Sequence, residues 1–203
     1  MEKIKYPERI RELADLLAQK LVVRKAKSLY GACNQNLNNV IAMESDYYGM
    51  TLQKSVVWKL RMLQEIDTNL TEHEPEVKKE LAEELTKFFQ GRIVRIADSI
   101  FARFDRVELP NKNNSVATFY GKAFDTFHKE ADPEFTSFGA VTKAVPSPMR
   151  LNLDDGQHYD LGFQNRSFVT WEEVESELKL VDPSGTFTKV VTDMLGIDKD
   201  GTP

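Results

Sequence analysis

The sequence predicts a mainly α-helical protein, in which an N-terminal, bundle-like helical region is followed by a small α+β region with one β-hairpin. Apolar residues recur at helical spacing through residues 8–106, and a Pro/Asn-rich segment then interrupts the pattern. Alternating apolar residues further on flank an Asp-Gly pair, which is typical of a tight hairpin turn. The predicted regions are 1–109 (helical), 110–148 (linker, short helix and irregular segment) and 149–203 (hairpin plus two helices).

The first predicted helix starts at Pro7, a residue that suits the first helical turn because its missing N–H costs little there. Its apolar residues repeat at spacings of three and four, and the repeat changes face near Val22. We expect helix through about Tyr30 and again to about Met43, with Gly31 either ending or interrupting it.

Two further helices are predicted before the linker. Residues 45–49 suit a turn, after which Thr51 can cap a helix that ends at 67–69. Thr71 and Glu74 then have the spacing of a capping box, and the apolar pattern that follows runs to about Arg106. This pattern changes face at Gln90-Gly91, which predicts a kink there.

Beyond the linker at 110–115, residues 116–127 have the apolar spacing of a short helix, and 132–148 are irregular. The β-hairpin is predicted at 149–163, around Asp155-Gly156, because both central residues of such a turn need positive φ. A capping box at Thr170 begins a helix, and a final short helix ends at Gly196.

The composition is that of an ordinary globular protein, with 41% hydrophobic and 29% charged residues in 203. No apolar run approaches the roughly 20 residues that a membrane span needs, and the N-terminus is charged. The single cysteine, Cys33, cannot form an internal disulfide. We therefore expect no membrane association and an intracellular, cytoplasmic location, or assembly into a particle made in the cytoplasm.

Charge is distributed in blocks. Residues 1–63 carry a net charge of +5, residues 64–90 carry −5, residues 91–130 carry +2 and residues 131–203 carry −7. Such blocks suggest that faces of one copy meet opposite faces of another copy or of an acidic protein partner. The alternative is a set of solvated surfaces of alternating sign.

Four arginines, Arg92, Arg95, Arg103 and Arg106, fall within about 60° of one another on the predicted helix. Because a guanidinium group binds carboxylate or phosphate in a forked geometry, such a row can grip an acidic protein face or a nucleic-acid backbone. The alternative is a solvated flank with intrachain pairs to acidic helices. The pI near 5.4 disfavours a dedicated DNA-binding protein.

Two other features are candidates for protein contacts. Tyr47 and Tyr48 lie in a predicted turn, where exposed aromatic residues can anchor an interface or fold back onto the core. Residues 33–39 include five amide side chains, which can hydrogen-bond across a helix–helix interface or simply form a polar face.

No pattern in the sequence predicts a catalytic residue, a cofactor or a metal. The three histidines form no zinc motif, and no nucleophile elbow or phosphate-binding glycine loop is present. If the chain is an enzyme of unrecognised class, its polar candidates are His128, His158 and Asp160.

These observations favour a non-enzymatic assembly or interaction subunit that forms a homo-oligomer. A structural component of a viral particle, such as a neck or connector ring, is one setting for such a subunit. A nucleic-acid-associated accessory protein and an enzyme of unrecognised class are the competing hypotheses.

Overall fold

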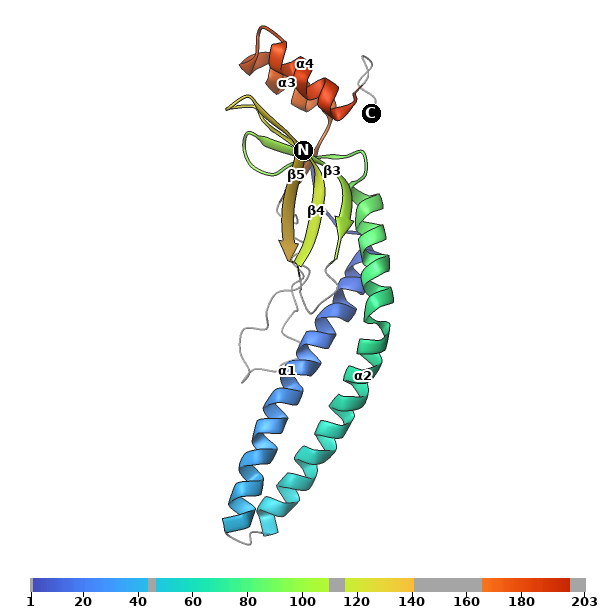
Figure 1. Cartoon of the computed structure of the whole chain (residues 1–203), viewed down its shortest axis with the longest axis vertical. Helices are drawn as coiled ribbons and strands as arrows, with labels where there is room; N and C mark the ends of the chain where they lie inside the picture. The colour runs from blue at the N-terminus through green and yellow to red at the C-terminus, as the bar shows by residue number, and fades with distance from the viewer. Residues whose placement is uncertain (1, 44–46, 110–115, 141–165, 198–203) are drawn as a thin grey trace.

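A long helical hairpin carries a small β-sheet at one end, and two short helices lie beyond the sheet (Figure 1). The computed structural model describes residues 2–43, 47–109, 116–140 and 166–197. The predicted β-hairpin at 149–163 and the predicted linker at 110–115 lie outside these residues.

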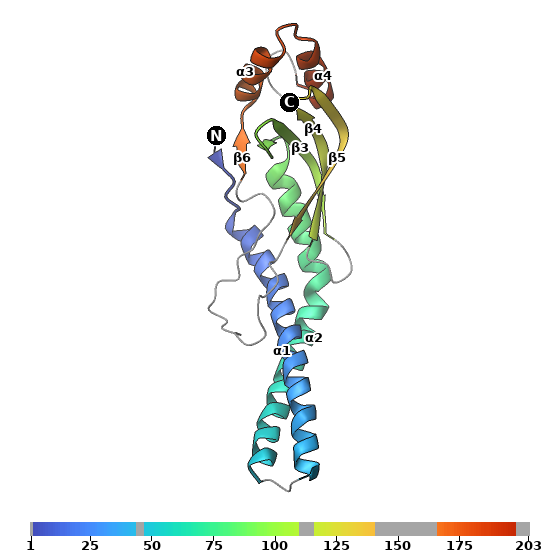
Figure 2. The same ribbon diagram turned by 90° about the vertical axis from the view of Figure 1, so that its left-hand side faces the viewer.

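The hairpin consists of α1 (Glu8–Met43) and α2 (Tyr47–Phe89), which run side by side in both views (Figures 1 and 2). With 43 residues, α2 is about 64 Å long at 1.5 Å per residue. It continues through residues 67–71 and through Pro75, where we had predicted a break between two helices. That prediction was wrong because contacts with α1 outweigh the local signals: ion pairs join Asp67 and Glu74 to α1 on either side of the predicted break.

The sheet has six strands, and all its pairings are antiparallel. Its spatial order is β1-β6-β2-β3-β4-β5. The strands are β1 (Glu2–Lys3), β2 (Ile93–Arg95), β3 (Ile100–Glu108), β4 (Val116–Asp125), β5 (Glu130–Ala140) and β6 (Ser167–Val169). The prediction of a helix-rich protein is thus confirmed, whereas a single hairpin understates the sheet.

Two segments predicted as helical are strands. Gly91, with φ of 72°, follows the end of α2, and the chain then forms β2 and β3 instead of a kinked helix. The predicted short helix at 116–127 is largely strand β4. Both segments are rich in β-branched and aromatic residues, which fit a pleated sheet buried on both faces. In β3, for example, Phe101 packs on one side of the sheet, whereas Ala102 and Phe104 pack on the other.

The two faces of the sheet build two hydrophobic clusters. One cluster lies between the sheet and the adjoining ends of α1 and α2, where Phe89 packs edge-on against Phe104 and Phe119. The other lies between the opposite face and the helices α3 (Trp171–Val181) and α4 (Thr186–Leu195). The core therefore occupies one end of an elongated molecule, and most of the hairpin projects away from it (Figure 2).

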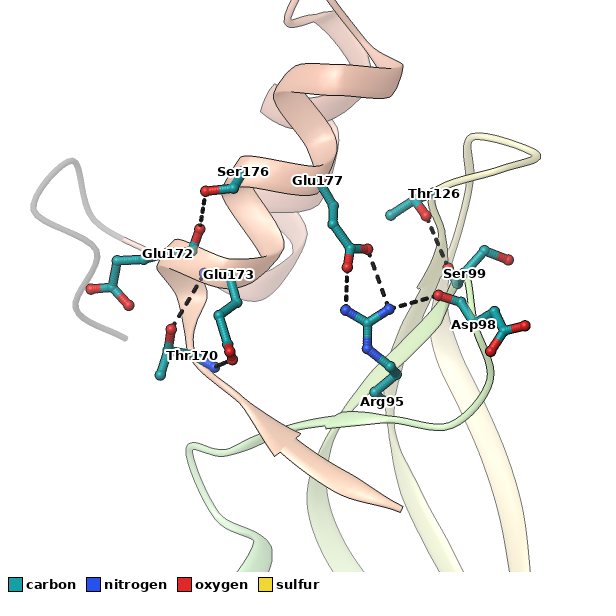
Figure 3. Close-up of polar contacts among 9 residues, drawn as sticks. All are labelled: Arg95, Asp98, Ser99, Thr126, Thr170, Glu172, Glu173, Ser176 and Glu177. Atoms are coloured by element: carbon teal, nitrogen blue, oxygen red, sulfur yellow. Dashed lines mark hydrogen bonds and ion pairs between the residues drawn. The ribbon is translucent and has the colours of Figure 1, made fainter. Parts of the chain in front are cut away.

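The two C-terminal helices confirm the sequence analysis. Thr170 and Glu173 form the predicted capping box at the start of α3, with both reciprocal hydrogen bonds present (Figure 3). Gly196 ends α4 in the left-handed conformation, with φ of 65°. Local signals succeeded here because each helix is short and is bounded by its own capping residues.

Candidate interaction surfaces

Near the sheet, α1 and α2 are joined by ion pairs. Lys20, whose side chain is 5% exposed, pairs with Glu74, and Glu74 also contacts Lys78 at 2.8 Å. Burial lowers the pKa of Lys20, and the neighbouring Arg24 lowers it further. Further along the hairpin, Lys27 Nζ lies 2.7 Å from a carboxylate oxygen of Asp67.

The charge blocks therefore meet within one chain. The basic α1 pairs with the acidic second half of α2, also through Arg9 and Glu80 at 2.6 Å. Across the sheet, Arg95 pairs with Glu177 of α3. The structure thus supplies an intrachain partner for the charges that suggested contacts between copies.

The far end of the hairpin has a different surface. We define the hairpin tip as residues 28–43 of α1 and 47–66 of α2. No Asp, Glu, Lys or Arg occurs in 28–43 or in 47–53, although 29% of the whole chain is charged. Charged side chains normally cover a solvated helix, so their absence from 23 described residues marks this surface as unusual.

Apolar side chains are exposed over the same tip. Met43 is 85% exposed, Tyr48 is 82% exposed and Trp58 is 61% exposed. Among the described residues of the tip, only Gly49 and Val56 are buried, so two helices alone do not cover their apolar residues. The other exposed apolar side chains of the tip are Val40, Met50, Leu52, Met62 and Ile66.

Two predicted contact features lie on this tip. Tyr47 is the first residue of α2, and its side chain is not described; Tyr48 is exposed rather than folded back onto the core. In the amide segment, Asn38 accepts a hydrogen bond from Gln53 across the two helices. The Oδ1 atom of Asn34 is buried and has no hydrogen-bond partner among the described residues. Part of the amide segment thus lies between the helices, and the rest faces outward.

The four arginines do not form a row on one helix. Arg92 precedes β2, Arg95 ends β2, and Arg103 and Arg106 lie in β3, so the helical angle that grouped them does not apply. Arg95 donates twice to Glu177 and once to the carbonyl of Asp98 at 2.7 Å (Figure 3). This arginine fixes α3 to the sheet.

The other three arginines have separate surroundings. Arg106 contacts Glu108 at 2.9 Å and lies over the ring of Tyr120. Arg92 stacks on two aromatic rings, and Arg103 is largely covered by its neighbours. The alternative reading, with intrachain pairs to acidic helices, describes Arg95, whereas Arg106 pairs within its own strand.

Of the three candidates for catalysis, only His128 lies in the described part of the chain. His128 lies in the exposed turn after β4, with its Nδ1 2.6 Å from Asp125. Burial alone would raise the pKa of Asp125, but hydrogen bonds from His128, Ser99 and the turn backbone lower it to about 2. The same hydrogen bond raises the pKa of His128. His158 and Asp160 lie outside the described residues.

Over the described part of the chain, no group of three or more His, Cys, Asp or Glu side chains is placed to hold a metal ion. In the same residues no helix is long and apolar enough to cross a membrane. Family models, curated proteins and solved structures contain no match to this chain. Its function is therefore argued from its own surfaces.

Proposed function

We propose that this chain is a non-enzymatic assembly or interaction subunit that associates with copies of itself through the hairpin tip. One observation carries the proposal: a helical tip with exposed apolar side chains, and with no charged residue in 28–43 or 47–53, projects from a protein whose other surfaces are strongly charged.

The composition of the tip matches that of an interface core. Such cores are depleted of charged residues and enriched in aromatic residues and Met, and the exposed side chains of the tip include Tyr48, Trp58 and three methionines. Large exposed apolar side chains that recur along one segment are a mark of interaction sites. The tip therefore resembles one side of a protein–protein interface.

A second copy of the chain fits this surface well. In an isologous contact the same patch of both copies meets at a two-fold axis. A charged side chain near that axis would therefore lie close to the identical charge of the other copy and be repelled by it. Residues 28–43 and 47–53 of the tip carry no charge and avoid this repulsion, and their amides can both donate and accept hydrogen bonds. Two hairpins can bury their apolar faces as a four-helix bundle, which two helices alone cannot do.

The competing functions have less support. A nucleic-acid backbone needs a basic surface, but Arg95 and Arg106 each contact a carboxylate of the same chain. A role in a viral neck or connector stays a proposal within the assembly hypothesis. It would require a closed ring, which a mass well above that of a dimer would reveal.

The test is the mass of the full chain in solution, measured by light scattering behind a sizing column. We expect a discrete multimer that persists between 0.1 and 1 M salt, because apolar contacts are not screened as ion pairs are. The double variant Met43→Lys, Leu52→Lys should run as a monomer. Its control is Leu180→Lys, since Leu180 of α3 is 81% exposed but lies far from the tip.

Two results would contradict the proposal. A monomeric wild-type chain at several hundred micromolar would rule out self-association. A multimer that survives both tip substitutions but dissociates with Leu180→Lys would place the contact on the sheet end instead.

A further inference from the structure

A small pocket opens where the sheet meets the C-terminal helices. Its volume is about 210 Å³, and it is lined by the chain around Arg92 and Ile93, by Arg103 of β3, by residues 168–171 and by Ile197. Four separate segments of the sequence thus converge on it. The site is distant from the hairpin tip and independent of the proposed function.

Two of the four arginines line this pocket, and they are the two without a close ion pair among the described residues. Arg103 is only 14% exposed, and its nearest acidic contact is Asp105 at 4.0 Å, the outer limit of an ion pair. A guanidinium group taken out of water without hydrogen-bond partners is costly. An anion in the pocket would supply the partner that the described residues do not.

Arg92 is held at the same pocket by aromatic rings. Its guanidinium carbon lies 5.0 Å from the ring centre of Phe88 and 4.8 Å from that of Phe168. Stacking on rings fixes the plane of the guanidinium group but leaves its N–H edge able to donate. These two rings pack on the cluster that faces α1 and α2, whereas Arg103 pairs with Ile93 and so faces the opposite side, with the apolar residues of the pocket. The preference of the pocket for negative charge therefore comes from Arg103.

The rest of the lining is apolar. Ile93, Val169 and Ile197 are buried, and Trp171 and Phe168 add aromatic surface. The pocket is smaller than the roughly 300 Å³ at which drug-sized sites begin, so it suits a compact ligand. The lining thus combines an anion-binding side with an apolar side.

We propose that this pocket binds a carboxylic acid with a short apolar or aromatic body, with the carboxylate on Arg103 and the body against Trp171. A free small acid and the C-terminal residue of a peptide share this chemistry. Forked arginine–carboxylate pairs favour a planar carboxylate over a simple spherical anion.

Ligand-observed NMR on the full chain tests the proposal with 3-phenylpropanoate and its neutral amide. The acid should bind at least tenfold more tightly than the amide, because only the acid can pair with Arg103. A Gly-Gly-Phe peptide with a free carboxylate, compared with its C-terminal amide, tells the two sources apart. Tighter binding of 3-phenylpropanoate would indicate a free small acid as the ligand, and tighter binding of the peptide would indicate the C-terminal residue of a peptide.

Matched variants sharpen the test. Arg103→Met should weaken binding of the acid about tenfold or more, whereas Arg92→Met should change it little because the Arg92 guanidinium group stacks on the other face of the sheet. Arg106→Met should leave it unchanged, because Arg106 is exposed in the same strand but does not line the pocket. The tip variant Met43→Lys, Leu52→Lys should bind the acid as the wild type does, which separates this site from the proposed function.

Equal binding of acid and amide by the wild-type chain would overturn the proposal, and this comparison does not depend on any variant folding. Undiminished acid binding by Arg103→Met would also overturn it. So would saturation by chloride at the same concentration, because it would show a general attraction of anions.

Discussion

The two ends of the helical hairpin are built from the same two helices but present opposite surfaces. Near the sheet, Leu81, Leu85 and Phe89 are fully buried, and the charges of α1 face those of α2. At the tip, charges are absent from one helix and from the start of the other, and apolar side chains face outward.

Near the sheet, charged and apolar side chains find their partners within the chain. At the tip, the apolar side chains remain exposed. Opposite charges that meet within a chain reduce its need for a charged partner. Exposed apolar side chains favour binding to a partner, because burying each one in a contact contributes roughly 1.5–3 kcal/mol to the free energy of association. An expectation based on net charge alone would place the contact near the sheet, whereas the exposed apolar side chains favour the tip.

The largest effect expected from this comparison concerns apolar truncation. Leu85→Ala should lower the free energy of unfolding by about 3 kcal/mol, because it opens a cavity in a packed cluster. Leu52→Ala at the tip should change it by less than about 0.5 kcal/mol in the monomer. Urea unfolding at a protein concentration below the association range measures both.

Similar losses for the two variants would mean that the tip is as well packed as the base. That result would remove the contrast on which the proposed contact surface depends. Leu52→Ala should instead weaken self-association, which the same samples show when they are concentrated.

A smaller effect is expected from the buried ion pairs. Glu74→Gln should cost about 2–3 kcal/mol, because removing one member of a buried pair leaves an uncompensated charge. Here Lys20 and Lys78 would both lose their ion pair with Glu74, and burial already lowers the pKa of each lysine.

The matched substitution is Glu84→Gln, also in α2, because Glu84 pairs with the exposed Lys87. An exposed pair contributes about 0–1 kcal/mol, so this variant should be nearly neutral. Equal changes in the free energy of unfolding for Glu74→Gln and Glu84→Gln would show that the ion pairs of Glu74 contribute no more to stability than an exposed pair does.

Much of the helical part could be predicted from the sequence, and the sheet could not. The capping box at Thr170 and the glycine after α4 are local signals, and the structure confirms them. By contrast, the apolar residues between Ile93 and Phe104 fit a helical face as well as a strand buried on both sides. Only pairing with distant strands decides between these patterns, and the sequence does not show such pairing.

The candidate surfaces illustrate the same limit. The arginine row depended on a helix that does not form, so its geometry was lost with the helix. The absence of charge from 28–43 and 47–53 was visible in the sequence, but the net charge of 1–63 averages it away. Its meaning depends on knowing that both segments lie side by side at one free end.

The smallest expected effect is a pH dependence at the sheet end that the tip should not share. The pKa of His128 is raised by its hydrogen bond to Asp125, and the pKa of Asp125 is held at about 2. A raised pKa means that the fold favours protonated His128. This contribution is fully present below pH 6.5 and is lost as the pH rises through the folded-state pKa.

His128→Gln should therefore lower the thermal midpoint at pH 5 and have less effect at pH 8. The helices of the tip contain no Asp, Glu, His, Lys or Arg in 28–43 or 47–53, so the mass of the multimer should be equal at the two pH values. If association weakened on the same pH range as the His128 effect, the turn after β4 would be part of the contact. The contrast between the two ends of the molecule would then fail, because the sheet end would be taking part in assembly.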